Sequence, residues 1–324
     1  MTWPKLSIVI FSDADPDGCV RILTDCERLK HQDLEFEVIM VLQGLTEKVE
    51  KMLKAYTFSY NLKFVMAASN ANRAMGRNQG VARAVNEIIL FLDSDLEISP
   101  ELLYYHLEAY SDSQTAAVMG EIFLPEFVKK SRWLRFMDSS YRSTRRWAAT
   151  TDVQTSPPLR YVNTANFSVK KTYYQACGGH CESIGNHEAE NIDLAHRISA
   201  LKQGIIRYQP EAITFCQHPP LKKGLRMKYE FGLEGIPGLL ELYPDLYPVL
   251  PSRFVKSAEY ASVKPVFRAF MSLLFTRPVF FVARGLRLLS PEFITFRMLR
   301  YMLQYEAVRG FRASIQDQPT NSSN

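Results

Sequence analysis

The chain has 324 residues, enough for one large domain or two smaller ones. Hydrophobic residues make up 47% and charged residues 23%, proportions that build a sizeable core and exclude a wholly disordered chain. The net charge of +5 is small for a protein dedicated to nucleic acid, so we expect no nucleic-acid partner. The charge is uneven, because residues 221–324 carry 15 Lys and Arg against 8 Asp and Glu.

The first 110 residues alternate short apolar runs with amphipathic segments. Strands are expected at 6–11, 36–42, 62–66 and 88–92, and helices at 19–30, 47–56, 77–86 and 100–110. The strands are almost continuously apolar, which is typical of a parallel sheet covered on both faces. The alternation predicts βαβ units and an α/β fold.

The pattern after residue 110 is less regular. Strands are expected at 116–123, 161–169, 205–208 and 212–216, and helices at 172–176 and 192–203. From about residue 221 the pattern is helical with proline interruptions. We therefore predict an α/β domain over 1–220, a basic and aromatic-rich helical extension over 221–315, and a disordered tail over 316–324.

Cysteine usage and the two chain ends bear on location. Five cysteines form no disulfide framework, and the first residues, Met1–Lys5, lead into a strand without the shape of a signal peptide. Both favour the cytoplasm. The apolar stretch 270–289 is interrupted by Arg277, Pro278, Arg284 and Arg287, so no transmembrane span is expected. Its basic and aromatic character predicts peripheral contact with the inner face of a membrane; the alternative is a solvated helical face.

Asp93-Ser94-Asp95 is the most informative short motif. It directly follows the buried strand at 88–92, and parallel sheets place ligands at the carboxyl ends of their strands. Two carboxylates two residues apart in a turn offer hard oxygen ligands to Mg²⁺ or Mn²⁺, which would neutralise a diphosphate. The alternative is an ordinary turn in which an aspartate caps a helix.

Further motifs accompany it in a fixed order. They are Gly76-Arg77-Asn78 with Gly80, Phe91-Leu-Asp-Ser-Asp95, Asn166-Phe-Ser-Val-Lys170, Cys177-Gly-Gly179, Glu190-Asn-Ile-Asp-Leu-Ala-His-Arg197 and the late His218. In this order they resemble the glycosyltransferase family 2 enzymes over about residues 5–220. The resemblance implies the GT-A fold, a Rossmann-like, mostly parallel sheet flanked by helices, here with a C-terminal helical extension.

The resemblance also implies an activity. Such enzymes transfer a sugar, with inversion, from a nucleotide-diphosphate sugar to a hydroxyl. The acceptor implied here is a glycan or lipid-linked glycan, as in polysaccharide biosynthesis, and a UDP-sugar is the default donor. A cation on the diphosphate stabilises the leaving group as its negative charge grows.

Residue roles follow from the same resemblance. Asp95 is expected to be the main metal ligand, with Asp93 sharing the metal or facing the ribose and His218 completing the shell. Arg77 is expected to contact the nucleotide or its diphosphate, because a guanidinium suits phosphate. Ser12 and Ser94 complete the expected donor site.

The sequence departs from the family at the catalytic base. The usual aspartate is replaced by Asn191, which cannot accept a proton. Glu190 is the expected base, with Glu188 and Asp193 behind it. Asp193 and Arg197 are four residues apart, so an ion pair on one helix face is the alternative role for Asp193.

A second departure lies after the second strand. Leu42-Gln43-Gly44-Leu45 stands where the family usually has Asp-Asp-Gly-Ser. Gln43, or Asp13 in the first turn, is then the candidate for reading the nucleotide base. The two departures motivate a rival function, a protein that binds nucleotide sugar or glycan without turnover. A nucleotidyltransferase ranks lower, because the turn at 12–18 has three aspartates and no basic residue.

A basic segment spans residues 129–146. It holds seven basic residues and one acid, Asp138, with aromatic residues interleaved. It is expected to hold an anionic acceptor, to touch anionic lipid, or to form an amphipathic helix with a solvated basic side.

Overall fold

The protein is described by a computed structural model. The residues it describes are 3–13, 15–29, 34–44, 51, 53, 55–125, 131–140, 143–149, 156–184, 187–201, 204–216, 219–254 and 265–316. The chain divides into two compact units. Unit 1 comprises residues 1–126, 147–183 and 191–217, and unit 2 comprises residues 127–146, 184–190 and 218–324.

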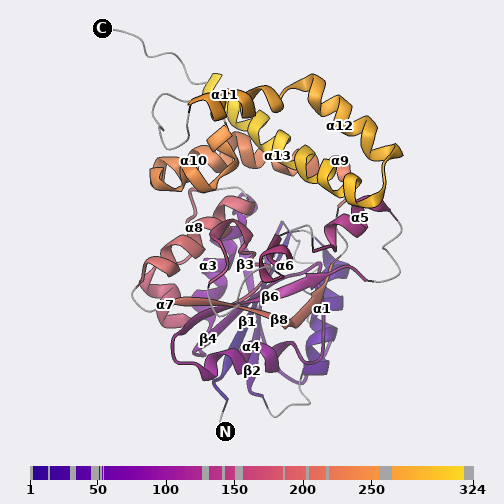
Figure 1. Ribbon diagram of the computed structural model, residues 1–324. Coiled ribbons are helices and arrows are strands. Elements are labelled where there is room, and N and C mark those ends of the chain that lie inside the picture. Colours follow the sequence, from indigo (N-terminus) through magenta and orange to yellow (C-terminus); the bar gives the residue numbers. More distant parts are fainter. Residues whose placement is uncertain are drawn as a thin grey trace. The chain divides into compact units, whose positions relative to one another are not determined.

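Unit 1 is built on one twisted sheet (Figure 1). Its described strands are β1 (Leu6–Asp13), β2 (Phe36–Gln43), β3 (Asn61–Ala67), β4 (Ile88–Asp93), β5 (Glu97–Ile98), β6 (Thr115–Phe123), β7 (Asn166–Lys170) and β8 (Ile205–Phe215). They lie in the order β3-β2-β1-β4-β7-β6-β8-β5. The first four in this order run parallel, as the sequence pattern predicts, whereas β7 is antiparallel to both β4 and β6.

Several boundaries differ from the sequence-based expectation. The strand expected at 161–169 begins only at Asn166, and the two strands expected at 205–208 and 212–216 form one strand, β8. Most of the helix expected at 47–56 lies outside the described residues. The short strand β5 was not predicted, because two residues carry too little periodicity to be recognised.

Helices cover both faces of the sheet. They are α1 (Pro16–Arg28), α3 (Arg73–Arg83), α4 (Leu102–Glu108), α7 (Lys171–Ala176) and α8 (His187–Ala200). The side chains of β1 alternate, so that Leu6, Ile8 and Ile10 pack with α1 and α4. Val9 and Phe11 point to the other face and pack with α3, α7 and α8. The sheet therefore has a buried core on each side, as its apolar strands predict.

Helix α3 lies close to the sheet through two glycines. A Cβ atom at Gly76 would lie 2.4 Å from the ring of Phe11, and one at Gly80 would lie 2.4 Å from Val9 Cγ1. The predicted helix at 77–86 starts four residues earlier than expected, at Arg73, where the side chain of Asn72 caps it. Both glycines of the Gly-Arg-Asn motif thus allow close packing, and they set the short distance between α3 and the sheet.

The motif residue Asn166 is part of a buried polar cluster in the sheet. Its side-chain oxygen lies 2.8 Å from His106 Nε2, and its amide group donates to the carbonyl oxygen of Ala212 at 2.9 Å. His106 Nδ1 lies 2.9 Å from the hydroxyl of Ser168. Burial lowers the pKa of His106 to about 4, and the bond to Asn166 only partly offsets this.

The buried His106 predicts loss of stability in acid. Its pKa is lower in the folded chain than in the unfolded chain, so the unfolded chain binds more protons between pH 6.5 and 4, and stability falls as the pH falls through that window. The loss should approach about 3 kcal/mol at pH 4. Urea unfolding at a series of pH values measures it. His106→Gln should flatten the pH dependence.

Unit 2 is helical. Its described elements are α5 (Arg132–Met137), most of α6 (Ser143–Ala148), α9 (Leu221–Glu230), η5 (Phe231–Gly235), α10 (Ile236–Leu242), η6 (Pro244–Val249), η7 (Pro251–Phe254), α11 (Pro265–Leu274), α12 (Arg277–Leu289) and α13 (Glu292–Gln316). The long α13 packs against α9, η5 and α12. Gly232 and Gly310 allow a close crossing, because a Cβ atom at either would lie about 2 Å from a carbonyl oxygen of the opposite helix. In the described part of the chain, no helix is long and apolar enough to cross a membrane.

The basic segment at 129–146 contributes to unit 2 rather than to the α/β unit. Trp133, Phe136 and Met137 of α5 are buried, and Phe136 packs edge-on against Phe296 of α13. Arg132 and Arg135 lie on the solvated side. Helix α5 packs as an amphipathic helix with a solvated basic side, which is one of the three roles considered, and residues 129–130 and 141–142 of the segment lie outside the described part.

Candidate active site

The candidate site lies where β1, β2 and β4 end. The strand register pairs Phe11 with Asp93 and Asp13 with Gln43, so the carboxyl ends of the three strands meet at one edge. The backbone amide of Ser94 donates to the carbonyl oxygen of Phe11 at 3.2 Å, which continues the register into the turn. A Cβ atom at Gly18 of α1 would lie 2.9 Å from Ser94 O, so the beginning of α1 closely approaches this turn.

Two arginines of α3 hold Asp93. Arg73 Nη1 lies 2.7 Å from Asp93 Oδ2, and Arg77 Nη2 lies 3.0 Å from Oδ1. The arginines are four residues apart, so they project from the same side of the helix. Each carboxylate oxygen faces its own guanidinium, and this arrangement fixes the orientation of Asp93.

Arg77 is almost completely buried, with 1% of its surface exposed. Its Nη1 donates to Thr164 Oγ1 at 2.6 Å, its Nη2 reaches Thr164 O at 3.3 Å, and its guanidinium lies 5.8 Å from the centre of the Phe91 ring. The expected contact with the nucleotide sugar is therefore not open to Arg77 in this arrangement, because its N–H groups point into the protein. Arg73, with 28% of its side chain exposed, is the guanidinium nearer to solvent.

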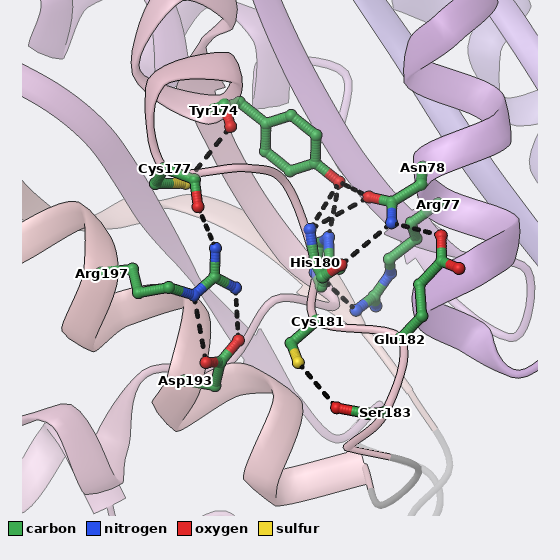
Figure 2. A network of polar contacts seen from close by, with 10 residues as sticks. All are labelled: Arg77, Asn78, Tyr174, Cys177, His180, Cys181, Glu182, Ser183, Asp193 and Arg197. Carbon is green, nitrogen blue, oxygen red and sulfur yellow. Dashed lines mark hydrogen bonds and ion pairs between the residues drawn. The ribbon is translucent and has the colours of Figure 1, made fainter. Parts of the chain in front are cut away.

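His180 contacts the guanidinium of Arg77 (Figure 2). Its Nε2 lies 3.4 Å from Arg77 Nη1, and its Nδ1 lies 2.8 Å from the hydroxyl of Tyr174. Burial, followed by the charges of Arg77 and Arg197, lowers the pKa of His180 well below its usual value. The ring is therefore neutral at pH 7. Because a guanidinium only donates, Nε2 accepts and the proton resides on Nδ1.

Asn78 anchors the segment that carries His180. Its side-chain oxygen accepts from the backbone amide of His180 at 3.0 Å, and its amide group donates to the carbonyl oxygen of His180 at 2.9 Å. The same amide group donates to Glu182 at 2.8 Å, and Tyr174 donates to the Asn78 oxygen at 2.6 Å (Figure 2). The Arg-Asn pair of the motif thus joins α3 to the loop after α7.

Asp95 is the carboxylate of the motif that reaches solvent. Apart from its own backbone amide, no described residue hydrogen-bonds to its side chain. The surrounding protein raises the pKa of Asp95 by desolvation, and the negative charges of Asp93 and Asp15 raise it further, against the opposing effect of Arg73. A cation beside Asp95 would relieve this repulsion, so the carboxylate fits a divalent metal. Among the described residues, no cluster of three or more His, Cys, Asp or Glu side chains forms a complete metal shell.

The remaining expected donor-site residues lie at the same strand ends. Ser12 is buried beside the thiol of Cys19, and Ser94 is 6% exposed. The amide group of Gln43 donates to the carbonyl oxygens of Ser69, at 3.2 Å, and of Ala71, so its nitrogen holds the loop before α3 and only its oxygen is left for a ligand. The side chain of Asp13 and the whole of His218 lie outside the described residues.

The three candidate carboxylates of α8 differ in their surroundings. Glu188 pairs with Lys228 of α9 within unit 2. Asp193 is completely buried and pairs through both oxygens with Arg197, which also donates to the carbonyl oxygen of Cys177 (Figure 2). The ion pair on one helix face, the alternative role for Asp193, is what the structure shows. Glu190 is 2% exposed and lies in the first turn of the helix.

Asn191, which stands at the position of the family's usual base, belongs to the Arg77 network. Its side-chain oxygen accepts a hydrogen bond from the hydroxyl of Thr164, which in turn accepts from Arg77. A chain of contacts therefore runs from Asn191 through Thr164 and Arg77 to Asp93. An asparagine serves here as a neutral acceptor.

Sequence reasoning missed three residues that shape this site. Arg73 could have been found, because it lies one helical turn before Arg77 in the same segment. His180 and Thr164 carried no usable signal. They lie 103 and 87 residues from Arg77 in the sequence, and only the tertiary fold brings them into contact with it.

Comparisons with known proteins agree with this geometry. The family model "Glycosyl transferase family 2" matches residues 26–176. A curated relative, the uncharacterized glycosyltransferase YfnE of Bacillus subtilis, is 32% identical over 88 residues. The match covers 27% of this chain and 22% of that relative, so the chain matches well under two thirds of the relative's length.

Two solved structures share the fold. The mannosyltransferase PcManGT from Pyrobaculum calidifontis, in complex with GDP-Man and Mn²⁺, is similar with a TM-score of 0.60 and 13% identity, over 95% of this chain and 87% of that chain. S. aureus TarS, residues 1–349, is similar with a TM-score of 0.51 and 13% identity, over 97% and 92% of the two chains.

The strand order and the structural neighbours define the fold of the chain, which is the GT-A fold. Within this fold, residues 26–176 are similar to the glycosyl transferase family 2 domain.

Proposed function

We propose that the protein transfers a sugar from a nucleotide-diphosphate sugar to a hydroxyl of a glycan or lipid-linked glycan, with inversion and with a divalent metal. The observation that carries the proposal is the state of the Asp93–Asp95 turn. One carboxylate is fixed by two arginines, and the next reaches solvent without a partner among the described side chains and with a raised pKa. A family 2 domain surrounds this turn.

The proposed roles divide between the two carboxylates. Asp95 would hold Mg²⁺ or Mn²⁺, with His218 as a further ligand, and the cation would offset the charge that grows on the departing diphosphate. Asp93 is already neutralised by Arg73 and Arg77, so it suits hydrogen bonding to the ribose better than a metal shared with Asp95. Arg77 acts on the donor through Asp93, and Arg73 is the arginine placed to reach a phosphate.

The acceptor hydroxyl needs a base as it attacks the anomeric carbon. We propose Glu190 for this step, since Asn191 cannot accept a proton and Asp193 is held by Arg197. The hydroxyl proton would pass to Glu190 as the new bond forms and the nucleoside diphosphate leaves from the opposite face. Glu188 is the second choice, because using it would require breaking its ion pair with Lys228.

The donor and the location are parts of the same proposal. UDP-sugars are the default from the family, and the GDP-Man found with PcManGT adds GDP-mannose as a second candidate donor. Among the described residues none hydrogen-bonds to the side-chain oxygen of Gln43, which could accept from a nucleotide base. We place the protein in the cytoplasm, in peripheral contact with a membrane, for which unit 2 carries the candidate surface.

Donor hydrolysis by the purified full-length chain tests the proposed function. UDP-, GDP- and dTDP-sugars are compared with Mn²⁺, with Mg²⁺ and after chelation. Metal-dependent release of one nucleoside diphosphate supports the transferase and names the nucleotide. Release that is equally fast in chelator contradicts the metal role.

Replacing Glu190 by glutamine should reduce turnover by about 10²–10⁴-fold, the range expected when a general base is lost. The change keeps the shape of a side chain that is 2% exposed. Glu188→Gln is the matched control on the same helical turn, and it should cost less than about tenfold, because the ion pair with Lys228 that it removes is partly exposed. A larger loss in Glu188→Gln would reverse the two assignments.

Binding without turnover is the alternative function. It is favoured by the amide at position 191, whose oxygen is engaged with Thr164. Calorimetric titration with UDP, GDP and dTDP, together with the hydrolysis assay, distinguishes a binding protein from a transferase. A nucleotide that binds in the presence of Mn²⁺, with neither hydrolysis nor transfer from any donor, would support the binding protein.

A further inference from the structure

The outer faces of α11 and α12 are apolar. Most of the exposed large hydrophobic side chains in the described part of the chain lie between residues 266 and 293. On α11, Val266, Phe270 and Leu273 follow the spacing of one helix face and are 62–83% exposed. The opposite side of α11 is tied to α13, because Arg312 donates to Ser272 and to the carbonyl oxygen of Phe275.

Helix α12 carries apolar side chains on two faces, one buried and one exposed. Phe280 and Ala283 are buried, and the ring of Phe280 stacks on Tyr305 of α13 with centroids 4.5 Å apart. Phe281 and Leu289 point away from α13, with exposed fractions of 61% and 90%. An exposed apolar face of this kind marks a site of interaction with another protein or with a membrane.

The charge on the two helices has one sign. Residues 265–291 contain four Arg and no Asp or Glu, and the next residue, Glu292, pairs with Arg135 of α5. On a helical wheel Arg277 and Arg284 lie at one edge of the exposed apolar face of α12. Burial and the positive charge of Arg284 lower the pKa of Arg287, and no described acid forms a salt bridge with Arg277, Arg284 or Arg287. These three arginines therefore have no carboxylate partner among the described residues.

The α12 helix is held firmly enough to present this face. Arg132 of α5 donates to Ser290 O at 2.9 Å and to Arg287 O at 3.2 Å, so it caps the carboxyl end of α12. Thr295 of α13 also donates to Arg287 O at 3.0 Å. Within unit 2 the exposed apolar side chains thus lie on α11 and α12, two helices that are hydrogen-bonded to their neighbours.

We propose that the outer faces of α11 and α12 form a docking surface for a bilayer that contains anionic phospholipid. The apolar side chains would enter the boundary between headgroups and acyl chains, and the arginines beside them would pair with lipid phosphates. The helices would lie in the interface and not cross it, since neither is long and apolar enough to span. The arginines of α11 and α12, with no acid on either helix, complement the negative phosphates of anionic lipid.

Vesicle flotation of the full-length chain tests the proposal. Vesicles of phosphatidylcholine alone are compared with vesicles that also contain phosphatidylglycerol, at low and high salt. Binding is expected only with phosphatidylglycerol and should weaken with salt. Phe281→Ser/Leu289→Ser and, separately, Arg284→Glu should each lower vesicle affinity by about tenfold or more.

The control variants carry the same changes elsewhere. Val85→Ser removes an exposed apolar side chain from unit 1, and Lys222→Glu reverses an exposed charge on α9. Both should bind vesicles as the unchanged chain does. A Leu289→Trp variant adds a direct readout, because its fluorescence should shift to the blue and be quenched by brominated acyl chains on binding.

Two results would overturn the proposal. One is the absence of binding to phosphatidylglycerol vesicles, or binding that the α12 variants leave unchanged. The other is a dimer in light scattering that Phe281→Ser/Leu289→Ser dissociates, which would make the surface an interface between copies of the chain. Donor hydrolysis without vesicles is measured in parallel and should be unaffected, so loss of docking and loss of the transfer reaction are distinguished.

Discussion

Replacing Asp95 by asparagine should lower metal-dependent release of nucleoside diphosphate by about 10²–10³-fold, the cost of removing a group that stabilises charge in the transition state. Asp95 reaches solvent and has no other partner among the described side chains, so the change should hardly affect folding. The remaining activity should need more Mn²⁺ for half-maximal rate, because an amide oxygen binds the cation more weakly than a carboxylate. A Mn²⁺ titration of the hydrolysis rate measures both effects.

Glu97→Gln is the matched control for this experiment. Glu97 is an exposed acid two residues further along the chain, in β5, and it has no place in the proposed site. The rate and the Mn²⁺ dependence of this variant should match those of the unchanged chain. Asp95→Asn with an unaltered Mn²⁺ dependence would remove Asp95 from the metal site, whatever happens to the rate.

Replacing Arg77 by methionine should destabilise the chain by about 3 kcal/mol, near the lower end of the cost of breaking a buried ion pair by removing one partner. The guanidinium is 1% exposed and contacts Asp93, Thr164 and His180, whose groups would lose a donor. Arg73 would still face one oxygen of Asp93, which limits the loss. Urea unfolding measures the change in the free energy of unfolding.

Two further variants show whether the loss comes from the buried charge. Arg83→Met makes the same substitution at an exposed position of α3 and should change stability by no more than about 0.5 kcal/mol. Arg77→Met combined with Asp93→Asn should recover part of the loss, because the carboxylate charge is then gone. If Arg77→Met and Arg83→Met are equally mild, Arg77 is not the support of Asp93 described above.

The position of Arg77 shows how far a motif can be interpreted without the fold. Its spacing from Asn78 and Gly80 indicates the family, and a guanidinium before a diphosphate site suggests contact with phosphate. The structure places it behind Asp93 instead, because Gly76 and Gly80 bring α3 so close to β1 that the side chain has no route to solvent. Arg73, one turn earlier, is the more exposed of the pair.

Some features of the sheet also follow from the local sequence pattern, and others do not. The strands at 6–11, 36–42, 62–66 and 88–92 were predicted within a few residues, since continuous apolar runs bounded by turns are a strong local signal. Their parallel pairing follows from the helices between them. The antiparallel β7 could not be predicted, because it depends on which strand pairs with β4 after more than seventy intervening residues.

The sequence by itself determined the α/β class, the resemblance to family 2 glycosyltransferases and the carboxylate pair at the end of β4, because apolar periodicity and the spacing of a motif are local properties of the chain. Tertiary structure alone decided which of the two carboxylates faces two arginines and which faces solvent. It also decided that Asn191 joins Arg77 through Thr164, and that the apolar outer face of α12 is left uncovered. These features depend on contacts between segments far apart in sequence, and burial is a property of the packed chain, not of any one segment.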